Sequence, residues 1–141
     1  MPAFTCQKRV RFHHCDPAGI VFFVQYFSIV NEVNEDWWNG PLDVDWRVFH
    51  IDQKMGMPIK KTSAEFFAPS YLSDILDCSL SIDRLGASSL PLTIKLTCKG
   101  ELRAIFYHVI VQISSNPVKA VPFSDELRAK LERFVVPREA R

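Results

Sequence analysis

The sequence has no long uninterrupted apolar run and no excess of charge of one sign. No apolar stretch reaches the roughly 20 residues that a membrane-spanning helix needs, and the first residues lack the charged-then-apolar order of a signal peptide. Lys and Arg total 17 against 16 Asp and Glu, so the net charge is +1. This balance gives no electrostatic reason to expect a nucleic-acid partner, and we expect a cytoplasmic protein without a membrane partner.

The cysteines also lack a recognisable pattern. The four residues are Cys6, Cys15, Cys78 and Cys98, and no two of them form a CxxC pair. In the absence of an export signal, we expect reduced thiols rather than a disulfide framework. The chain shows no internal repeat, low-complexity tract or linker, and its 141 residues are enough for one hydrophobic core. We therefore predict one domain over residues 1–141.

The apolar pattern changes its period near the start of the chain. Residues 4–14 alternate between apolar and polar side chains, which predicts a half-buried strand that includes Phe12 and ends at a DPAG turn. From about 23 to 38 the period becomes helical, with a broad aromatic face. The Asn-Gly-Pro sequence at 39–41 is a strong stop, because Gly suits a left-handed cap and Pro cannot continue a helix.

The rest of the chain is rich in strand patterns. Strand-like stretches follow at residues 57–67, 75–85, 90–98 and 102–113. The last stretch is apolar on both parities, as expected of a central strand. A short helix or loop is expected at about 46–52, and Ser124 can cap a terminal helix. Because an antiparallel sheet with one apolar face can cover an aromatic helix, we predict an α+β fold with the sheet wrapped around a long central helix.

The residues HHCD before the turn are all possible metal ligands. Adjacent strand residues point to opposite faces, so His13 and His14 are not expected to converge on one ion. The same geometry disfavours a catalytic pair of Cys15 with His14, and no metal site is predicted. His14 is either a half-buried strand end or a catalytic residue. His108 lies among apolar residues and is expected to be a satisfied core histidine.

Asp16 allows a structural and a functional interpretation. An Asp before Pro is common in turns, where its carboxylate accepts backbone N–H bonds. However, Asp16 also precedes the expected start of the aromatic helix, where unpaired N–H groups carry partial positive charge. A carbonyl placed there would be polarised as in an oxyanion hole, and a nearby carboxylate would attack it or activate water. The aromatic surface would bind an apolar acyl group.

The stretch HHCDPAGIVFFVQYF closely resembles the DCDPAGIV segment of the 4-hydroxybenzoyl-coenzyme A thioesterase family, which has the hot-dog fold. The stretches GMPI and AEFFAPSYLSDIL also resemble that family, so the resemblance covers roughly residues 4–115. It implies an acyl-CoA thioesterase that needs no cofactor besides the coenzyme A of its substrate. Asp16 would be the nucleophile or general base, and the Phe23 backbone N–H would polarise the thioester carbonyl. His14 is a further catalytic candidate.

The same resemblance implies the substrate contacts. Asn31 matches a helix position at which the family contacts the polar end of an aromatic acyl group, with an amide here in place of a carboxylate. The turn RLGASS retains one cation where the best-known members carry a basic run for the coenzyme A phosphates. The predicted substrate-binding residues are Gly19, Phe22, Phe27, Asn31, Lys60, Lys61 and Arg84.

Two other functions fit the same fold, because fold alone does not decide chemistry. One is a non-catalytic protein that binds acyl thioesters, with Asp16 as a turn residue. The other is a hydroxyacyl-thioester dehydratase that pairs His14 with Asp16. A homodimer or homotetramer is also expected, because a single curled sheet leaves edge strands open and because hot-dog sites usually form between subunits.

Overall fold

The computed structural model describes residues 3–138. In chain order, its elements are β1 (Phe4–Arg9), the 3₁₀ turn η1 (Phe12–His14), α1 (Phe23–Asn39), the π-helical turn η2 (Val48–Asp52), β2 (Met55–Gly56), β3 (Ile59–Phe66), β4 (Ile75–Ile82), β5 (Ser89–Cys98), β6 (Glu101–Val111), β7 (Ile113–Ser115), β8 (Val118–Ala120) and α2 (Asp125–Glu132).

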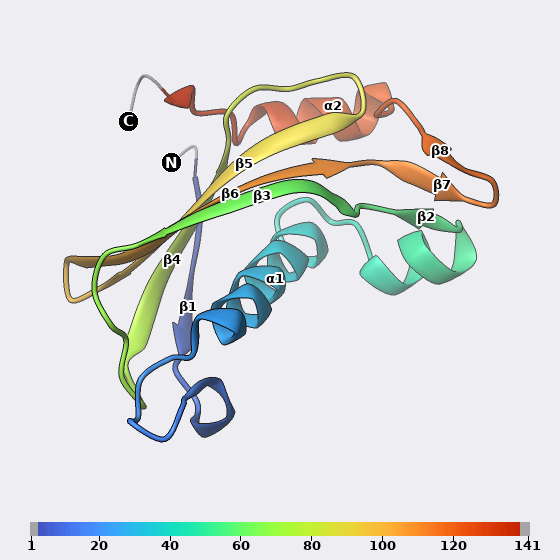
Figure 1. Ribbon diagram of the computed structural model, residues 1–141. Coiled ribbons are helices and arrows are strands. Elements are labelled where there is room, and N and C mark those ends of the chain that lie inside the picture. Colours follow the sequence, from blue (N-terminus) through green and yellow to red (C-terminus); the bar gives the residue numbers. More distant parts are fainter. Residues whose placement is uncertain (1–2, 139–141) are drawn as a thin grey trace.

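A five-stranded antiparallel sheet curves over the long helix α1 (Figure 1). Its strand order is β1-β4-β5-β6-β3, so β1 and β3 form its two edges. The register aligns Leu80, Ile94 and Phe106 across three neighbouring strands, and all three side chains are buried. The predicted α+β fold, with an antiparallel sheet wrapped around a central helix, is confirmed.

The helical period of the sequence identifies the core face of α1. The buried residues of this helix are Tyr26, Ile29, Val30, Val33, Trp37 and Trp38. Phe23 belongs to the same expected face, but its side chain is 55 % exposed, and its ring meets that of Phe66 on the edge strand β3 at 6.5 Å. The first turn of α1 therefore leaves apolar surface open beside β3.

Two local expectations are wrong. The first strand ends at Arg9, because the chain then closes a 3₁₀ turn in which the Arg11 N–H donates to His14 Nδ1 at 2.9 Å. As a result, Phe12 is 81 % exposed instead of lying on an inward parity. The helix does end at Asn39, but Gly40 has a φ of −88° and is not left-handed; its N–H donates to Asp36 O at 2.8 Å.

The structure also contains a second sheet and a covered outer face of the main sheet, which the sequence patterns did not predict. A second sheet, ordered β2-β7-β8, extends beyond the main one. In the main sheet, the middle strand is β5. Its residues Pro91 and Thr93 point away from α1, and they are buried as well. The segment after α2 contributes to that cover, with Arg138 lying 4.1 Å from the ring centre of Tyr107. The predicted cap on α2 is confirmed, because Ser124 accepts a hydrogen bond from the Leu127 N–H. Among residues 3–138, no helix is long and apolar enough to cross a membrane.

Candidate active site

The DPAG sequence forms the tip of a tight hairpin that leads into α1. The Asp16 N–H donates to Ile20 O at 2.9 Å, and the Phe22 N–H donates to His14 O at 3.0 Å. Between these two bonds, Cys15 pairs with Val21 in an antiparallel bridge. The hairpin therefore folds Asp16 back beside the residues that immediately precede the helix.

The turn fixes one oxygen of the Asp16 carboxylate and leaves the other open. Oδ1 accepts the Ala18 N–H at 2.9 Å, which is the local bond expected of a turn aspartate. Within residues 3–138, Oδ2 accepts no hydrogen bond. Gly19 occupies the left-handed region with φ +79°, where a side chain would be strained. The turn thus holds the carboxylate in one orientation without using all of its acceptor capacity.

The start of α1 is not capped. Phe22 is the N-cap residue and has no side chain that can accept a hydrogen bond, and the first turn carries no acidic residue. The Gln25 N–H donates to Phe22 O at 2.8 Å, whereas the N–H groups of Phe23 and Val24 have no partner among the described residues. Unpaired N–H groups and the helix dipole give this end a positive potential, which suits a carbonyl oxygen that gains negative charge.

A loop between β3 and β4 supports the hairpin. The Val21 N–H donates to Ser70 O at 2.8 Å, and the Leu72 N–H donates to Gly19 O at 3.0 Å. The buried hydroxyls of Ser70 and Tyr26 are 2.9 Å apart, which connects this loop to the first turns of α1. The position of the catalytic candidate therefore depends on a segment more than 50 residues further along the chain.

A buried ion pair holds this loop, and the sequence analysis missed it. Arg103 on β6 donates from Nη1 to Asp74 Oδ2 at 2.8 Å and to Pro69 O at 3.0 Å, although Arg103 is only 8 % exposed. The backbone N–H of Tyr71, followed by Arg103, lowers the pKa of Asp74. A single Arg in the apolar run of β6 was the available signal, because buried charges need partners.

Aromatic side chains surround the open helix start. The rings of Phe22 and Phe23 meet edge to face at 5.2 Å, and Phe27 meets Phe106 at 5.1 Å. Beside Phe23 lies a shallow apolar depression of about 330 Å³, which Tyr26 and Phe66 also line. Asn31, two helical turns beyond Phe23, is exposed. The structure therefore places Phe23 beside the edge strand β3 and Phe27 beside β6, while Asn31 is exposed further along α1.

His14 and His108 are both buried and incompletely paired. His14 uses Nδ1 to accept the Arg11 N–H, and its Nε2 has no partner within the described residues. His108 Nε2 also lacks a partner there. The prediction that His108 is buried is therefore confirmed, whereas the prediction that its ring nitrogens are fully hydrogen-bonded is wrong. Burial lowers the pKa of both imidazoles. His14 is placed as a structural member of the turn that precedes Asp16.

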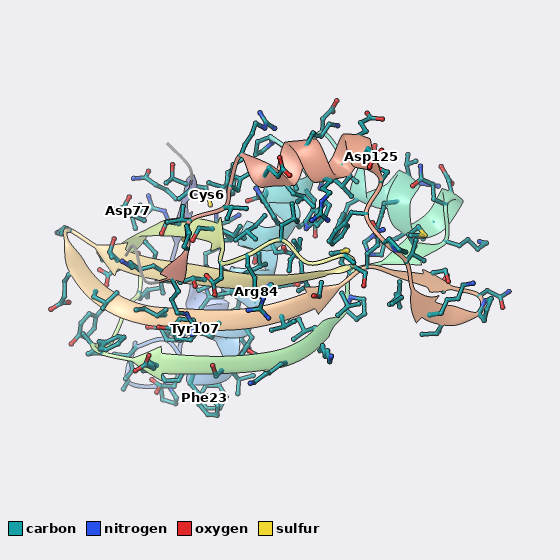
Figure 2. The ribbon with its side chains drawn as sticks, turned by 90° about the horizontal axis from the view of Figure 1, so that it is seen from above. Cys6, Phe23, Asp77, Arg84, Tyr107 and Asp125 are labelled. Carbon is teal, nitrogen blue, oxygen red and sulfur yellow. The ribbon has the colours of Figure 1, made fainter. Side chains whose placement is uncertain are left out.

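Of the three cations predicted to contact coenzyme A, two line the same groove and one does not. Lys61 and Arg84 line one groove of about 1100 Å³ over the outer face of the sheet, together with Arg128 and Arg138. Lys60 is not part of that lining. Figure 2 shows Arg84 and Tyr107 over the sheet, whereas Phe23 lies at the β3 edge. The groove that holds these cations and the depression at the helix start share no lining residue.

The imidazoles of His13 and His14 are closer than strand geometry predicted. Their ring centres lie 4.1 Å apart because both residues belong to the 3₁₀ turn and not to β1. No group of three or more His, Cys, Asp or Glu residues gathers as a possible metal site in the part of the chain that is described.

Comparison with known proteins adds a consistent set of relatives. The chain is 31% identical over 134 residues to a 1,4-dihydroxy-2-naphthoyl-CoA hydrolase of Thermosynechococcus vestitus, covering 93% of this chain and 90% of the relative. It is 28% identical over 132 residues to the enzyme of the same name from Nostoc punctiforme, with 92% and 87% covered. Among solved structures, the gentisyl-coenzyme A thioesterase BH1999 matches with a TM-score of 0.80 and 25% identity, covering 91% of this chain and 99% of that one.

The family model agrees with this set. The model of the thioesterase-like superfamily matches residues 10–131, which include the hairpin, all of α1 and every strand of the main sheet except β1. The chain belongs to the thioesterase-like superfamily and has its hot-dog fold.

Proposed function

We propose that this protein hydrolyses acyl-coenzyme A thioesters that carry an aromatic acyl group. The observation that carries the proposal is the uncapped start of α1 beside the hairpin that holds Asp16. Two unpaired N–H groups, at Phe23 and Val24, face a site with no competing carboxylate in the first helical turn. The superfamily membership and the names of the relatives support the same reaction class.

The proposed mechanism uses only groups of this chain. The thioester carbonyl lies against the helix start, where the Phe23 N–H stabilises the negative charge that develops on its oxygen. Asp16 then acts as a nucleophile that forms a mixed anhydride, which water hydrolyses, or as a general base that activates water. In either case the thiolate of coenzyme A leaves and takes up a proton. No step of this scheme uses a metal or redox cofactor.

The aromatic surface indicates the class of acyl group. A flat ring placed along Phe23 and Phe27 would pack against π faces and remove apolar area from water. Two relatives are named for a dihydroxynaphthoyl thioester and the structural neighbour for a gentisyl thioester, and both acyl groups are hydroxylated aromatic rings. Asn31 can donate and accept hydrogen bonds, so it suits a ring hydroxyl at the far end of such a group.

The nucleotide of coenzyme A is proposed to lie outside this aromatic surface. Lys61, Arg84 and Arg128 line the outer groove without an ion-pair partner among residues 3–138. Arg128 is held by hydrogen bonds to two backbone carbonyls, which leaves Lys61 and Arg84 as the cations that are free, within the described part of the chain, to bind an anion. Arg138 is already paired with Asp83 at 3.6 Å. Two free cations favour phosphate, although solvated surface charge is the simpler role for each.

We further propose a cytoplasmic homodimer or homotetramer. The edge strand β3 pairs with β6 on one side, and its other edge has no partner among the described residues. Phe66 and Phe67 at its end are each about half exposed, at 49 % and 51 %. A second copy would cover this apolar edge and close the open side of the acyl surface.

A panel of thioesters tests the proposal. The purified protein is assayed with coenzyme A esters of benzoate, 4-hydroxybenzoate, gentisate, 1,4-dihydroxy-2-naphthoate and hexanoate, and the free acid and free thiol are quantified together. We expect hydrolysis with the highest kcat/KM for a hydroxylated aromatic ester. Tight binding without turnover of any ester favours the non-catalytic binding protein. Loss of water from a hydroxyacyl ester, with the thioester intact, favours the dehydratase.

A further inference from the structure

Cys6 and Cys78 lie opposite each other across two neighbouring strands. The antiparallel register of β1 with β4 pairs Cys6 directly with Cys78. Directly opposed residues in such a pair have Cα atoms about 4.5 or 5.5 Å apart, and a disulfide requires about 4.4–6.8 Å. Both side chains pack against the hydrophobic core, so they share one face of the sheet. The backbone therefore already meets the geometric requirement for a bond between the two sulfurs.

The two thiols differ in their access to solvent. Cys78 is 1 % exposed, whereas Cys6, on the edge strand, is partly exposed. Figure 2 shows Cys6 at the side of the molecule opposite to Phe23, so this pair is separate from the candidate active site. A small oxidant can reach Cys6 from solvent, while Cys78 is accessible from Cys6.

The surroundings of Cys6 favour its thiolate. Interaction with the adjacent Cys78 thiol, followed by the nearby Lys8 ammonium, lowers the pKa of Cys6 despite burial and the charge of Asp36. The same interaction and burial raise the pKa of Cys78. The Cys78 thiol itself donates to Leu76 O at 3.7 Å. Burial, followed by Asp16, raises the pKa of Cys15, the other thiol that is partly exposed. Cys6 is therefore the thiol best prepared for nucleophilic attack.

We propose that Cys6 and Cys78 form a reversible oxidation site for hydroperoxides. The Cys6 thiolate attacks the peroxide oxygen, an S–O bond forms, the O–O bond breaks, and the departing alkoxide or hydroxide takes a proton from solvent. The Cys78 sulfur then attacks the Cys6 sulfenic acid. The S–O bond breaks, the S–S bond forms, and the hydroxyl leaves as water with the Cys78 proton. The two thiols lose two electrons to the peroxide in total, and a dithiol reductant restores them.

Peroxide treatment of the reduced full-length protein tests this site. Hydrogen peroxide or cumene hydroperoxide is added, and peptide mass spectrometry locates the modified cysteines. We expect a Cys6–Cys78 crosslinked peptide that disappears with dithiothreitol. Cys78→Ala should instead leave a Cys6 sulfenic acid that dimedone traps, whereas Cys6→Ser should leave Cys78 unmodified. Cys98→Ala, which removes another buried thiol, is the matched control and should retain the crosslink.

A rate measurement makes the test independent of the variants. In the wild-type protein at neutral pH, iodoacetamide should alkylate Cys6 faster than Cys15, because the pKa of Cys6 is lowered and that of Cys15 is raised, so Cys6 has the larger thiolate fraction. Three results would each overturn the proposal: no crosslinked peptide in the wild-type protein, faster alkylation of Cys15, or unchanged oxidation of Cys78 in Cys6→Ser. None of these outcomes depends on whether the protein hydrolyses thioesters.

Discussion

The exchange of Asp16 for Asn tests the proposed catalytic role apart from the role in the turn, because the two roles would depend on different properties of one side chain. The turn needs an acceptor for the Ala18 N–H, which lies 2.9 Å from Oδ1. The amide oxygen of Asn supplies that acceptor, so the change replaces a hydrogen bond to a charged group with one to a neutral group. That difference is worth about 1 kcal/mol, and for a chain of this size it corresponds to a shift of roughly 4 °C in the thermal midpoint.

The effect on turnover should be far larger. An amide is neither basic enough to activate water nor able to form the anhydride. We expect kcat/KM to fall at least about 10²-fold, which is about 2.7 kcal/mol at the transition state. Hydrolysis of the best ester in the panel is followed by loss of thioester absorbance, and the thermal midpoint and oligomeric state are measured on the same preparation.

Asp45→Asn is the matched control for this experiment. Asp45 Oδ1 accepts the Val48 N–H at 3.0 Å, so the control makes the same chemical change at the same kind of local hydrogen bond, far along the sequence from the hairpin. We expect it to retain turnover. If Asp16→Asn folds normally and its turnover matches that of Asp45→Asn, the carboxylate is only a turn residue and the proposed mechanism is wrong.

Four further predictions concern stability, specificity and assembly. Burial lowers the pKa of His14 and His108 in the folded protein. The stability that depends on their neutral forms is therefore fully present above a pH of about 6.5, and it declines by up to about 1.4 kcal/mol per pH unit per histidine as the pH falls. A denaturant midpoint that stays constant from pH 7 to 5 contradicts this. Phe27→Ala should shift the preference from aryl toward alkyl thioesters in a folded protein, whereas equal losses on both would make Phe27 a core residue only. Asp74→Asn should lower stability by about 2 kcal/mol, because it replaces the charged acceptor of Arg103 Nη1 with a neutral amide while Glu101 still pairs with Arg103 Nε at 2.7 Å; a change under about 0.5 kcal/mol in urea unfolding refutes this. Sedimentation at micromolar concentration should show a dimer or tetramer, and a fully active monomer would contradict the role proposed for the β3 edge.

Hydrophobic periodicity predicted the fold well, because the apolar side chains that are buried recur with the period of the helix or strand that carries them. The helical pattern between 23 and 38 agrees with α1 at Phe23–Asn39 to within one residue, since the long helix must turn one stripe toward the sheet. The alternation in 90–98 predicted β5 as a strand but not its burial on both faces. That burial depends in part on the segment after α2, and a local pattern carries no information about which distant segment covers a strand.

The site was only partly predictable for the same reason. The residues of the hairpin are consecutive, so Asp16 and the helix start were found together from one stretch of sequence. The loop between β3 and β4 and Arg103 are both distant from the hairpin in the sequence. The loop reaches Gly19 and Val21 through backbone hydrogen bonds, and Arg103 holds the loop through its side chain. The resemblance of the RLGASS turn predicts Arg84 as a coenzyme A contact, with Lys61 as a further candidate cation, yet both line a different surface from the helix start.

The turn and functional interpretations of Asp16 are compatible, and the geometry explains why. A carboxylate free to rotate would pay conformational entropy to reach any one orientation, and a nucleophile or base acts best when its position is already set. The hydrogen bond from the Ala18 N–H to Oδ1 restrains the side chain, and Oδ2 accepts nothing from residues 3–138. The bond that makes Asp16 an ordinary turn residue would therefore also orient its second oxygen for the chemistry proposed at the start of α1.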